Sequence, residues 1–292
     1  MDEHLPSAVE LLRSALRERG YLADRGLATA VQLSMRLGRP LLLEGEPGVG
    51  KSALAKVLAE LLEVPLIRLQ CYEGIDASQA LYELDDPLQL LHLRAVEASG
   101  LDPERVESDL YTERFLLERP LLKALRAGSR GILLIDEIDR ADDEFEAFLL
   151  EVLAEFQVSI PELGTISAAE PPVVILTSNR TRELHPALRR RCLYPWIDHP
   201  TAEREAEIIR ARAPEVDMPL ARRVADVVAR VRALELFKPP GVAESIDWAR
   251  VLKMYEVDEL DVVVADDTLG VLVKEHDDLL RVRAALPEVL DA

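Results

Sequence analysis

Gly45-Glu-Pro-Gly-Val-Gly-Lys-Ser52 stands between an apolar run of strand length, residues 40–44, and a helical pattern over residues 52–62. It matches the pattern G-x-x-x-x-G-K-[S/T]. Glycines let such a loop curl until its backbone N–H groups point at phosphate oxygens, and the following helix presents its positive end to the same anion. Average glycine usage produces the pattern by chance in on the order of one chain in a hundred. The loop therefore predicts nucleotide binding.

The residue types of this loop also predict separate roles. Lys51 is expected to reach the β- and γ-phosphates, and Ser52 is expected to ligate Mg²⁺. The predicted cofactors are thus ATP and Mg²⁺. The phosphate-binding set comprises Gly45, Glu46, Pro47, Gly48, Val49, Gly50, Lys51 and Ser52.

Short apolar runs alternate with helical patterns over the first two hundred residues. After residues 40–44, the runs are residues 65–71, 131–135, 173–177 and a weaker 193–197. The helical patterns cover residues 5–38 and 52–62, and also 73–128, where prolines break them. This alternation predicts an α/β fold with a parallel sheet covered by helices on both faces. A small β-hairpin is expected over residues 157–167, which alternate around a Pro/Gly turn.

The pattern changes near residue 200. Residues 202–236 and 243–292 have helical periodicity with few strand signals. We therefore predict a nucleotide-binding α/β domain over residues 1–199 and a small, mainly helical domain over residues 200–292.

Two acidic residues end the third apolar run. Asp136 and Glu137 follow Ile132-Leu-Leu-Ile135, and strand ends on one edge of a parallel sheet share a crevice. Asp136 is expected to hold Mg²⁺ there together with Ser52, and Glu137 to polarise the attacking water. The competing interpretation is a solvated acidic turn.

Polar residues also follow the fourth run and precede the fifth. The amide of Asn179 is placed to contact the γ-phosphate or the attacking water, although Asn is also a common turn residue. The cluster Arg189-Arg-Arg191 offers a cation that completes a neighbouring subunit's site. A solvated or salt-bridged basic cluster is the alternative.

Composition restricts the class of protein. The chain has 292 residues with 54 acidic and 35 basic side chains, a net charge of −19 that disfavours nucleic-acid partners. No stretch approaches the ~20 apolar residues of a membrane span. The acidic start MDEHLPSAVE is unlike a signal peptide, and Cys71 and Cys192 lack metal or redox spacing. We expect a cytoplasmic protein with no membrane span.

Taken together, the residues resemble the AAA+ superfamily and, within it, the MoxR-type ATPases, close to the subgroup associated with carbon monoxide dehydrogenase maturation (CoxD-like). The resemblance covers roughly residues 20–255. It is carried by Tyr21-Leu-Ala-Asp-Arg-Gly-Leu-Ala28, Leu69-Gln-Cys-Tyr-Glu-Gly74, Phe115-Leu-Leu-Glu-Arg-Pro-Leu121, Leu188-Arg-Arg-Arg-Cys192 and Pro240-Gly-Val-Ala-Glu-Ser-Ile-Asp-Trp-Ala249.

The resemblance implies a role for each motif residue. The phosphate loop corresponds to Walker A, Asp136 and Glu137 to Walker B, and Asn179 to sensor 1. Arg191 corresponds to the arginine finger, with Arg189 as the fallback. The segment 157–167 is similar to the hairpin before sensor 1, and the C-terminal helical domain to the AAA+ lid.

The same resemblance implies the working assembly. Members of this family form hexameric rings and act with a partner that contains a von Willebrand factor A (VWA) domain. Together they insert or activate metal cofactors in client enzymes. The implied partners are therefore a VWA-domain protein, a client metalloenzyme and further copies of this chain.

Two positions depart from the family pattern. Ser245 occupies the lid position where many relatives carry a sensor-2 arginine, and Arg250 is the nearest replacement. A salt-bridged surface role for Arg250 is the alternative. Residues 81–87 lack the aromatic side chains expected there, and this segment is expected to face a client or partner.

Three other functions share the same scaffold. A small-molecule P-loop kinase would transfer phosphate to an alcohol or acid, but the Asp136-Glu137 pair and the trailing arginines argue against it. A nucleic-acid-associated AAA+ motor conflicts with the charge of −19. A scaffold that binds nucleotide without hydrolysis conflicts with the competent residues at each catalytic position.

Overall fold

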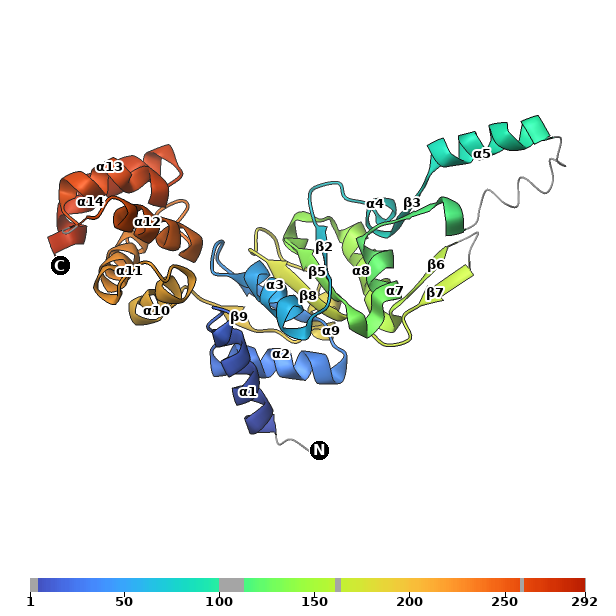
Figure 1. Ribbon diagram of the computed structural model, residues 1–292, viewed down its shortest axis with the longest axis horizontal. Helices are drawn as coiled ribbons and strands as arrows, with labels where there is room; N and C mark the ends of the chain where they lie inside the picture. The colour runs from blue at the N-terminus through green and yellow to red at the C-terminus, as the bar shows by residue number, and fades with distance from the viewer. Residues whose placement is uncertain (1–4, 100–112, 161–163, 258–259, 292) are drawn as a thin grey trace. The chain divides into compact units, whose positions relative to one another are not determined.

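The computed structural model describes residues 5–99, 113–160, 164–257 and 260–291 (Figure 1). The chain divides into two compact units. The sheet unit consists of residues 26–44 and 58–195, and the helical unit consists of residues 1–25, 45–57 and 196–292.

The central sheet has five strands in the order β2-β5-β8-β1-β9. They are β1 (Leu41–Gly45), β2 (Leu66–Gln70), β5 (Ile132–Asp136), β8 (Val173–Ser178) and β9 (Trp196–Ile197). The β2–β5, β5–β8 and β8–β1 pairs are parallel, as the apolar runs predict. Every residue of β1 and β5 is buried, which is typical of strands covered on both faces. The α/β prediction is confirmed.

Strand register brings polar residues to one edge of the sheet. Gln70 is paired with Asp136, and Glu44 is paired with Ser178. Because Ile135 is paired with Leu176, the next residues, Asp136 and Thr177, lie side by side where β5 ends. The alignment of β2, β5, β8 and β1 therefore assembles a site from four distant segments.

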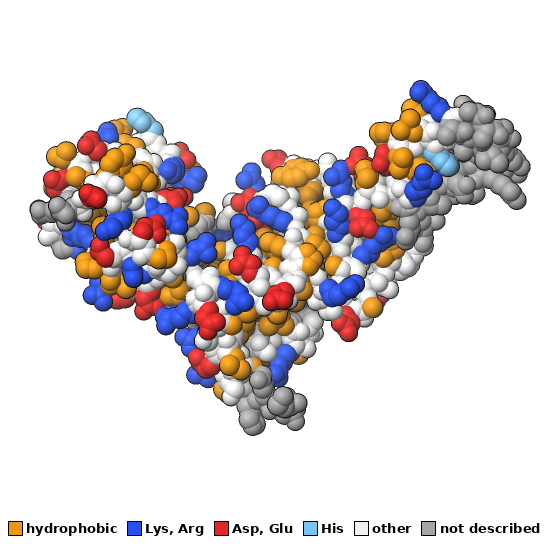
Figure 2. Space-filling model, in the orientation of Figure 1, with side chains coloured by type: hydrophobic (Ala, Val, Ile, Leu, Met, Phe, Trp, Pro, Cys, Tyr) orange, Lys and Arg blue, Asp and Glu red, His pale blue; other side chains and the backbone are white. Residues whose placement is uncertain are grey.

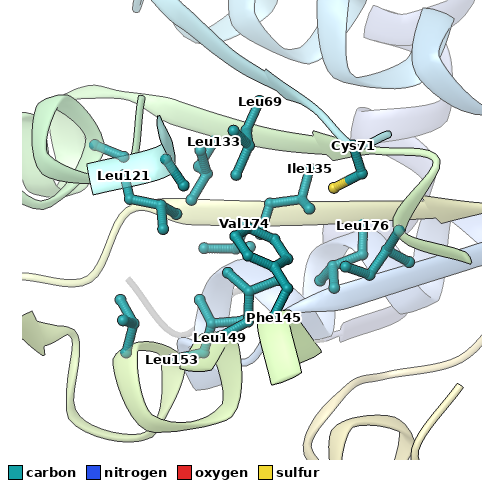
Figure 3. Close-up of a cluster of buried hydrophobic side chains, with 14 of the residues drawn as sticks. Leu69, Cys71, Leu121, Leu133, Ile135, Phe145, Leu149, Leu153, Val174 and Leu176 are labelled. Atoms are coloured by element: carbon teal, nitrogen blue, oxygen red, sulfur yellow. The ribbon is translucent and has the colours of Figure 1, made fainter. Parts of the chain in front are cut away.

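The sheet packs against helices through alternate residues of its strands (Figure 3). Leu133 and Ile135 of β5 lie with Val174 and Leu176 of β8 in one buried cluster. Helices α7 (Pro120–Ala127) and α8 (Asp143–Glu155) complete this cluster with Leu121, Phe145, Leu149 and Leu153. Such packing fixes the strand ends, since a packed interior resists even small displacements.

Most predicted helices of this part are present. The predicted patterns contain α1 (Leu5–Glu18), α2 (Arg25–Leu37), α3 (Lys51–Leu62), α4 (Ala77–Leu81) and α5 (Asp86–Ser99), whereas α8 and α9 (Pro186–Arg191) lie outside them. Short 3₁₀ turns occur at η1 (Glu113–Phe115), η2 (Gly128–Arg130) and η3 (Ile138–Arg140).

Two small antiparallel pairs lie outside the main sheet. The predicted hairpin is confirmed as β6 (Gln157–Ile160) and β7 (Gly164–Ser167), although residues 161–163 of its turn lie outside the described residues. The second pair, β3 (Tyr82–Leu84) with β4 (Leu116–Glu118), falls within the stretch 73–128 predicted as helical. That prediction missed these strands because three residues are too few to show a period.

The C-terminal residues are helical, as predicted. Helices α10 (Ala202–Arg212), α11 (Met218–Arg232), α12 (Val242–Met254), α13 (Val262–Leu272) and α14 (His276–Asp291) surround one apolar core that includes the buried Trp248. Thr201, Asp217 and Asp261 cap α10, α11 and α13 through their side-chain oxygens. None of the helices in the described ranges is long and apolar enough to cross a membrane.

Candidate functional site

The phosphate loop of the helical unit curls around the side chain of Lys51. The Lys51 ammonium donates to the carbonyl oxygens of Gly45 and Glu46, at 2.7 Å each, and only 7% of the residue is exposed. Gly48 and Gly50 have φ angles of +78° and +95°, which side chains other than glycine rarely adopt. The loop is therefore held in a tight curl directly before α3.

A second glycine packs against this loop from the start of α12. A Cβ atom at Gly48 would lie 2.7 Å from the Cα of Gly241, and Val242 donates its N–H to the Gly48 carbonyl at 3.0 Å. Gly241 donates its own N–H to Glu244 Oε2 at 3.0 Å. The first turn of α12 thus touches the phosphate loop within the helical unit, and larger side chains at either glycine would separate them.

Ser245, which stands at the sensor-2 position, belongs to a buried ion-pair network. Its hydroxyl lies 2.6 Å from an oxygen of the fully buried Glu205. Arg232 binds both oxygens of that carboxylate, at 2.5 and 2.8 Å, and its Nε donates to the Pro240 carbonyl at 2.8 Å. This network holds the segment that carries Gly241 against the phosphate loop. Glu205 and Arg232 belong to no motif, so the sequence alone does not point to them.

Arg250 lies farther along α12 and contacts other residues of the helical unit. Its guanidinium donates to the Arg212 carbonyl at 2.7 Å and lies 3.3 Å from Glu215 and 3.7 Å from Asp247. Its role as a substitute sensor stays a prediction.

His199 lies near two cations of the helical unit, Lys51 and Arg232, and its protonation is expected to destabilise the fold. Burial, with Arg232 and Lys51 nearby, lowers the pKa of His199 from 6.5 to about 4. The unfolded chain therefore takes up a proton at this position as the pH falls from about 6.5 to 4, whereas the folded chain does not. The free energy of unfolding therefore decreases as the pH falls through that window. Above pH 6.5 this histidine does not change it.

In His199→Phe, the free energy of unfolding is expected to change less between pH 6.5 and 4 than in wild type. Chemical denaturation of both proteins at several pH values measures the difference in stability. His276→Gln, at an exposed histidine of α14, serves as the control and should behave as wild type. An equal loss of stability from pH 7 to 5 in wild type and His199→Phe would contradict the prediction.

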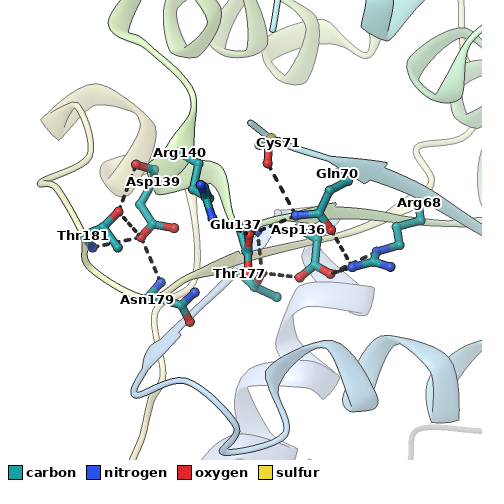
Figure 4. Close-up of polar contacts among 10 residues, drawn as sticks. All are labelled: Arg68, Gln70, Cys71, Asp136, Glu137, Asp139, Arg140, Thr177, Asn179 and Thr181. Atoms are coloured by element: carbon teal, nitrogen blue, oxygen red, sulfur yellow. Dashed lines mark hydrogen bonds and ion pairs between the residues drawn. The ribbon is translucent and has the colours of Figure 1, made fainter. Parts of the chain in front are cut away.

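At the edge of the sheet unit, Asp136 lies between Thr177 and Arg68 (Figure 4). The Thr177 hydroxyl donates to Asp136 Oδ1 at 2.6 Å, and it accepts the N–H of Glu137 at 2.9 Å. Arg68 Nε and Nη2 lie 3.0 and 2.5 Å from Asp136 Oδ2. The Asp136 carboxylate, in a residue only 2% exposed, is thus oriented from two neighbouring strands.

Glu137 has an unusual backbone conformation and a defined side-chain partner. Its φ angle of +56° places a non-glycine residue in the left-handed region, which costs about 1–2 kcal/mol. Gln70 at the end of β2 donates to Glu137 Oε2 at 3.1 Å, and Arg140 lies 3.8 Å from the same oxygen. Strained residues of this kind cluster at functional sites. The left-handed backbone and the hydrogen bond from Gln70 therefore mark Glu137 as a candidate functional residue.

Asn179 follows β8 and is positioned by Asp139. The N–H of Asn179 donates to Asp139 Oδ2 at 3.2 Å, and Thr181 donates to the same oxygen through its N–H and its hydroxyl at 2.9 and 2.7 Å. Asp139 is 2% exposed and comes from the turn after Glu137. One buried carboxylate therefore sets the path of the chain that carries Asn179.

The three arginines of α9 have different surroundings. Arg189 lies 3.6 Å from the buried Glu44 and over the ring of Tyr194, whose hydroxyl donates to Glu44 at 2.6 Å. Arg39 donates to the carbonyls of Arg190 and Arg191 at 2.8 and 3.0 Å, which anchors the end of the helix. Arg191 is exposed, and its guanidinium makes no salt bridge within the described ranges.

Comparison with known proteins identifies the family of this sequence. A family model described as AAA domain (dynein-related subfamily) matches residues 40–192, which is just over half of the chain. The denitrification regulatory protein NirQ of Pseudomonas aeruginosa is 26% identical over 68% of this chain and 70% of its own length. NirQ of Stutzerimonas stutzeri is 25% identical over 70% of this chain and 67% of its own.

A more distant likeness is found among solved structures. A mutant of Thermotoga maritima RuvB has a TM-score of 0.49 and 18% identity, over 93% of this chain and 72% of its own.

Proposed function

The chain belongs to the AAA domain family, dynein-related subfamily, and from this premise we propose that it is an ATP-hydrolysing AAA+ motor of the MoxR type. The observation that supports hydrolysis best is the fixed pair Asp136 and Glu137 at the end of β5. The strand β1, which pairs with β8 beside them, continues directly into the phosphate loop. Parallel strands end at one edge, so chain connectivity supports a shared nucleotide site there.

The residues present fit Mg²⁺. No cluster of three His, Cys, Asp or Glu side chains suited to a metal exists in the described part of the chain. A magnesium ion on a nucleotide needs only one or two protein oxygens, because phosphates and water supply the others. Asp136 and Ser52 provide a carboxylate and a hydroxyl for it. When bound, Mg²⁺ neutralises the charge that develops on the phosphates.

The remaining residues position the reactants. Lys51 and the loop amides bind the phosphates, Glu137 accepts a proton from the attacking water, and Asn179 orients the water or the γ-phosphate. Arg191 of a neighbouring subunit compensates charge in the transition state. Binding and hydrolysis alter the contact between Gly48 and Gly241, and the lid transmits this change to a partner.

The client belongs to the proposal as well. We infer that the ring acts with a VWA-domain protein and activates a metalloenzyme, as the resemblance to the carbon monoxide dehydrogenase maturation subgroup implies. Two relatives are named denitrification regulatory proteins, and this supports a regulatory role. The buried, free thiols of Cys71 and Cys192 support a reducing compartment such as the cytoplasm.

Two alternatives predict different kinetics. A P-loop kinase would close its site within one subunit. A nucleic-acid motor would be stimulated by DNA or RNA in a salt-dependent manner.

Basic and acidic side chains are interspersed on the face shown in Figure 2, so this face has neither a basic groove nor a basic stripe that would bind nucleic acid.

Steady-state ATPase activity, measured against protein concentration and Mg²⁺, tests the proposed function. We expect hydrolysis that EDTA abolishes, because the phosphates then lack their counter-ion. Specific activity should rise with concentration as subunits assemble. Turnover that is independent of protein concentration would instead support the kinase, and salt-sensitive stimulation by nucleic acid would support the nucleic-acid motor.

A further inference from the structure

Arg68 of β2 contacts both acidic parts of the proposed site. Its Nε and Nη2 atoms bind Asp136 Oδ2, and the same Nη2 lies 2.5 Å from Gln70 Oε1. The amide of Gln70 in turn donates to Glu137 Oε2 at 3.1 Å. One guanidinium therefore connects the carboxylate proposed to hold Mg²⁺ with the carboxylate proposed to activate water (Figure 4).

The two members of the ion pair differ in their exposure. The side chain of Asp136 is 3% exposed, whereas that of Arg68 is 52% exposed. A buried carboxylate that loses a counter-charge is destabilised, which favours a cation beside Asp136. An arginine that is half in solvent is readily solvated by water when it is released, so its exchange costs little where another cation takes its place beside Asp136. Asp136 is thus held in place, whereas Arg68 can be exchanged for another cation.

The position of β2 in the sheet explains why Arg68 can move away from Asp136. β2 is the edge strand of the sheet, and Gln70 rather than Arg68 is in register with Asp136. Arg68 and Gln70 are two residues apart, which places both side chains on the same face of the strand. Arg68 therefore reaches Asp136 diagonally from the solvent side.

Both Asp136 oxygens have partners, but of different kinds. Oδ1 accepts from the Thr177 hydroxyl, which belongs to a neighbouring strand and also receives the Glu137 N–H. Oδ2 lies against the movable guanidinium. A metal ion that approaches this carboxylate therefore competes with Arg68 for Oδ2, and Thr177 keeps the carboxylate oriented during the exchange.

We propose that Arg68 is a positioning residue that acts as the counter-ion of Asp136 until Mg²⁺–nucleotide binds and displaces it. This inference rests on the proposed function, because it assumes that Asp136 is the metal-holding carboxylate.

Binding of a fluorescent, non-hydrolysable ATP analogue to the full chain, titrated with Mg²⁺, tests the proposal without reference to turnover. In Arg68→Ala the half-saturating Mg²⁺ concentration should fall about three- to tenfold, since a competing cation is gone. Affinity at saturating Mg²⁺ should change less than twofold. Arg68→Lys keeps a charge near Asp136 and should remain close to wild type. If the alanine variant does not fold, Arg68→Gln serves in its place, because it removes the charge but keeps part of the aliphatic stem and a polar end.

Arg140→Ala is the matched control. Arg140 has a similar exposure, 57%, but lies 3.8 Å from Glu137 rather than on Asp136. Its loss should shift the Mg²⁺ requirement less than twofold. An unchanged or higher Mg²⁺ requirement in Arg68→Ala, or an equal fall in Arg140→Ala, would overturn the proposal. A wild-type protein that binds the analogue equally well without Mg²⁺ would also overturn this proposal, whereas a wild-type protein that binds no analogue at any Mg²⁺ concentration would overturn the proposed function.

Discussion

Glu137→Gln is expected to lower the turnover of ATP by about 10²–10⁴-fold, the usual contribution of a general base. An amide has the shape of the carboxylate but does not accept a proton from water. Its oxygen can still accept the hydrogen bond from Gln70, and the Thr177 hydroxyl still holds the backbone of residue 137, so the site should keep its geometry. ATP binding should therefore persist. Steady-state hydrolysis and equilibrium binding, measured on the same preparation, separate the two effects.

Glu144→Gln provides the control for charge. Glu144 is an exposed acid in the first turn of α8, only seven positions farther along the chain. Removing its charge should leave both hydrolysis and binding as in wild type. Undiminished turnover in Glu137→Gln would exclude Glu137 as the base. Loss of binding in the same variant would mean that Glu137 supports the site structurally.

The parts of this protein that could be predicted from sequence are those with a local signal. The strand ending at Asp136 is an unbroken apolar run, and the phosphate loop is defined by its own glycines. Periodicity likewise predicts α11, whose buried residues recur at helical spacing. Such signals need no knowledge of what packs against the segment.

Other residues have roles that arise from contacts between distant segments, so no local pattern predicts them. Arg68 reaches Asp136 across 68 positions, and Asp139 binds the segment at Asn179 across 40. Both contacts follow from the strand order β2-β5-β8, which no local pattern specifies. The β3–β4 pair was missed for the same reason, since each three-residue strand is defined only by its partner. Ser245 stands where relatives carry a sensor-2 arginine, and its hydroxyl donates instead to the buried Glu205.

The choice between Arg189 and Arg191 as the arginine finger is one that the sequence left open. Arg189 is engaged within its own subunit, where it lies against the buried Glu44 and the ring of Tyr194. Glu44 directly precedes the phosphate loop and accepts from Ser178, the residue before Asn179. Arg189 is thus placed to support the site in cis. Arg191 is exposed at the end of a helix whose carbonyls Arg39 anchors, which suits a cation that acts outside its own subunit.

Arg191→Ala is therefore expected to lower turnover by about 10³–10⁵-fold, the range for arginine fingers. Folding should be unaffected, because no salt bridge of the Arg191 guanidinium exists within the described ranges. Mixing with Glu137→Gln subunits should restore activity, since these lack the base but still supply Arg191 to a neighbour. Arg189→Ala should also lose activity, but mixing should not rescue it, because its own sites are impaired. Rescue of Arg189→Ala instead of Arg191→Ala would make Arg189 the finger. An unimpaired Arg191→Ala, with specific activity independent of concentration, would mean a site closed within one subunit and would return the kinase as the better interpretation.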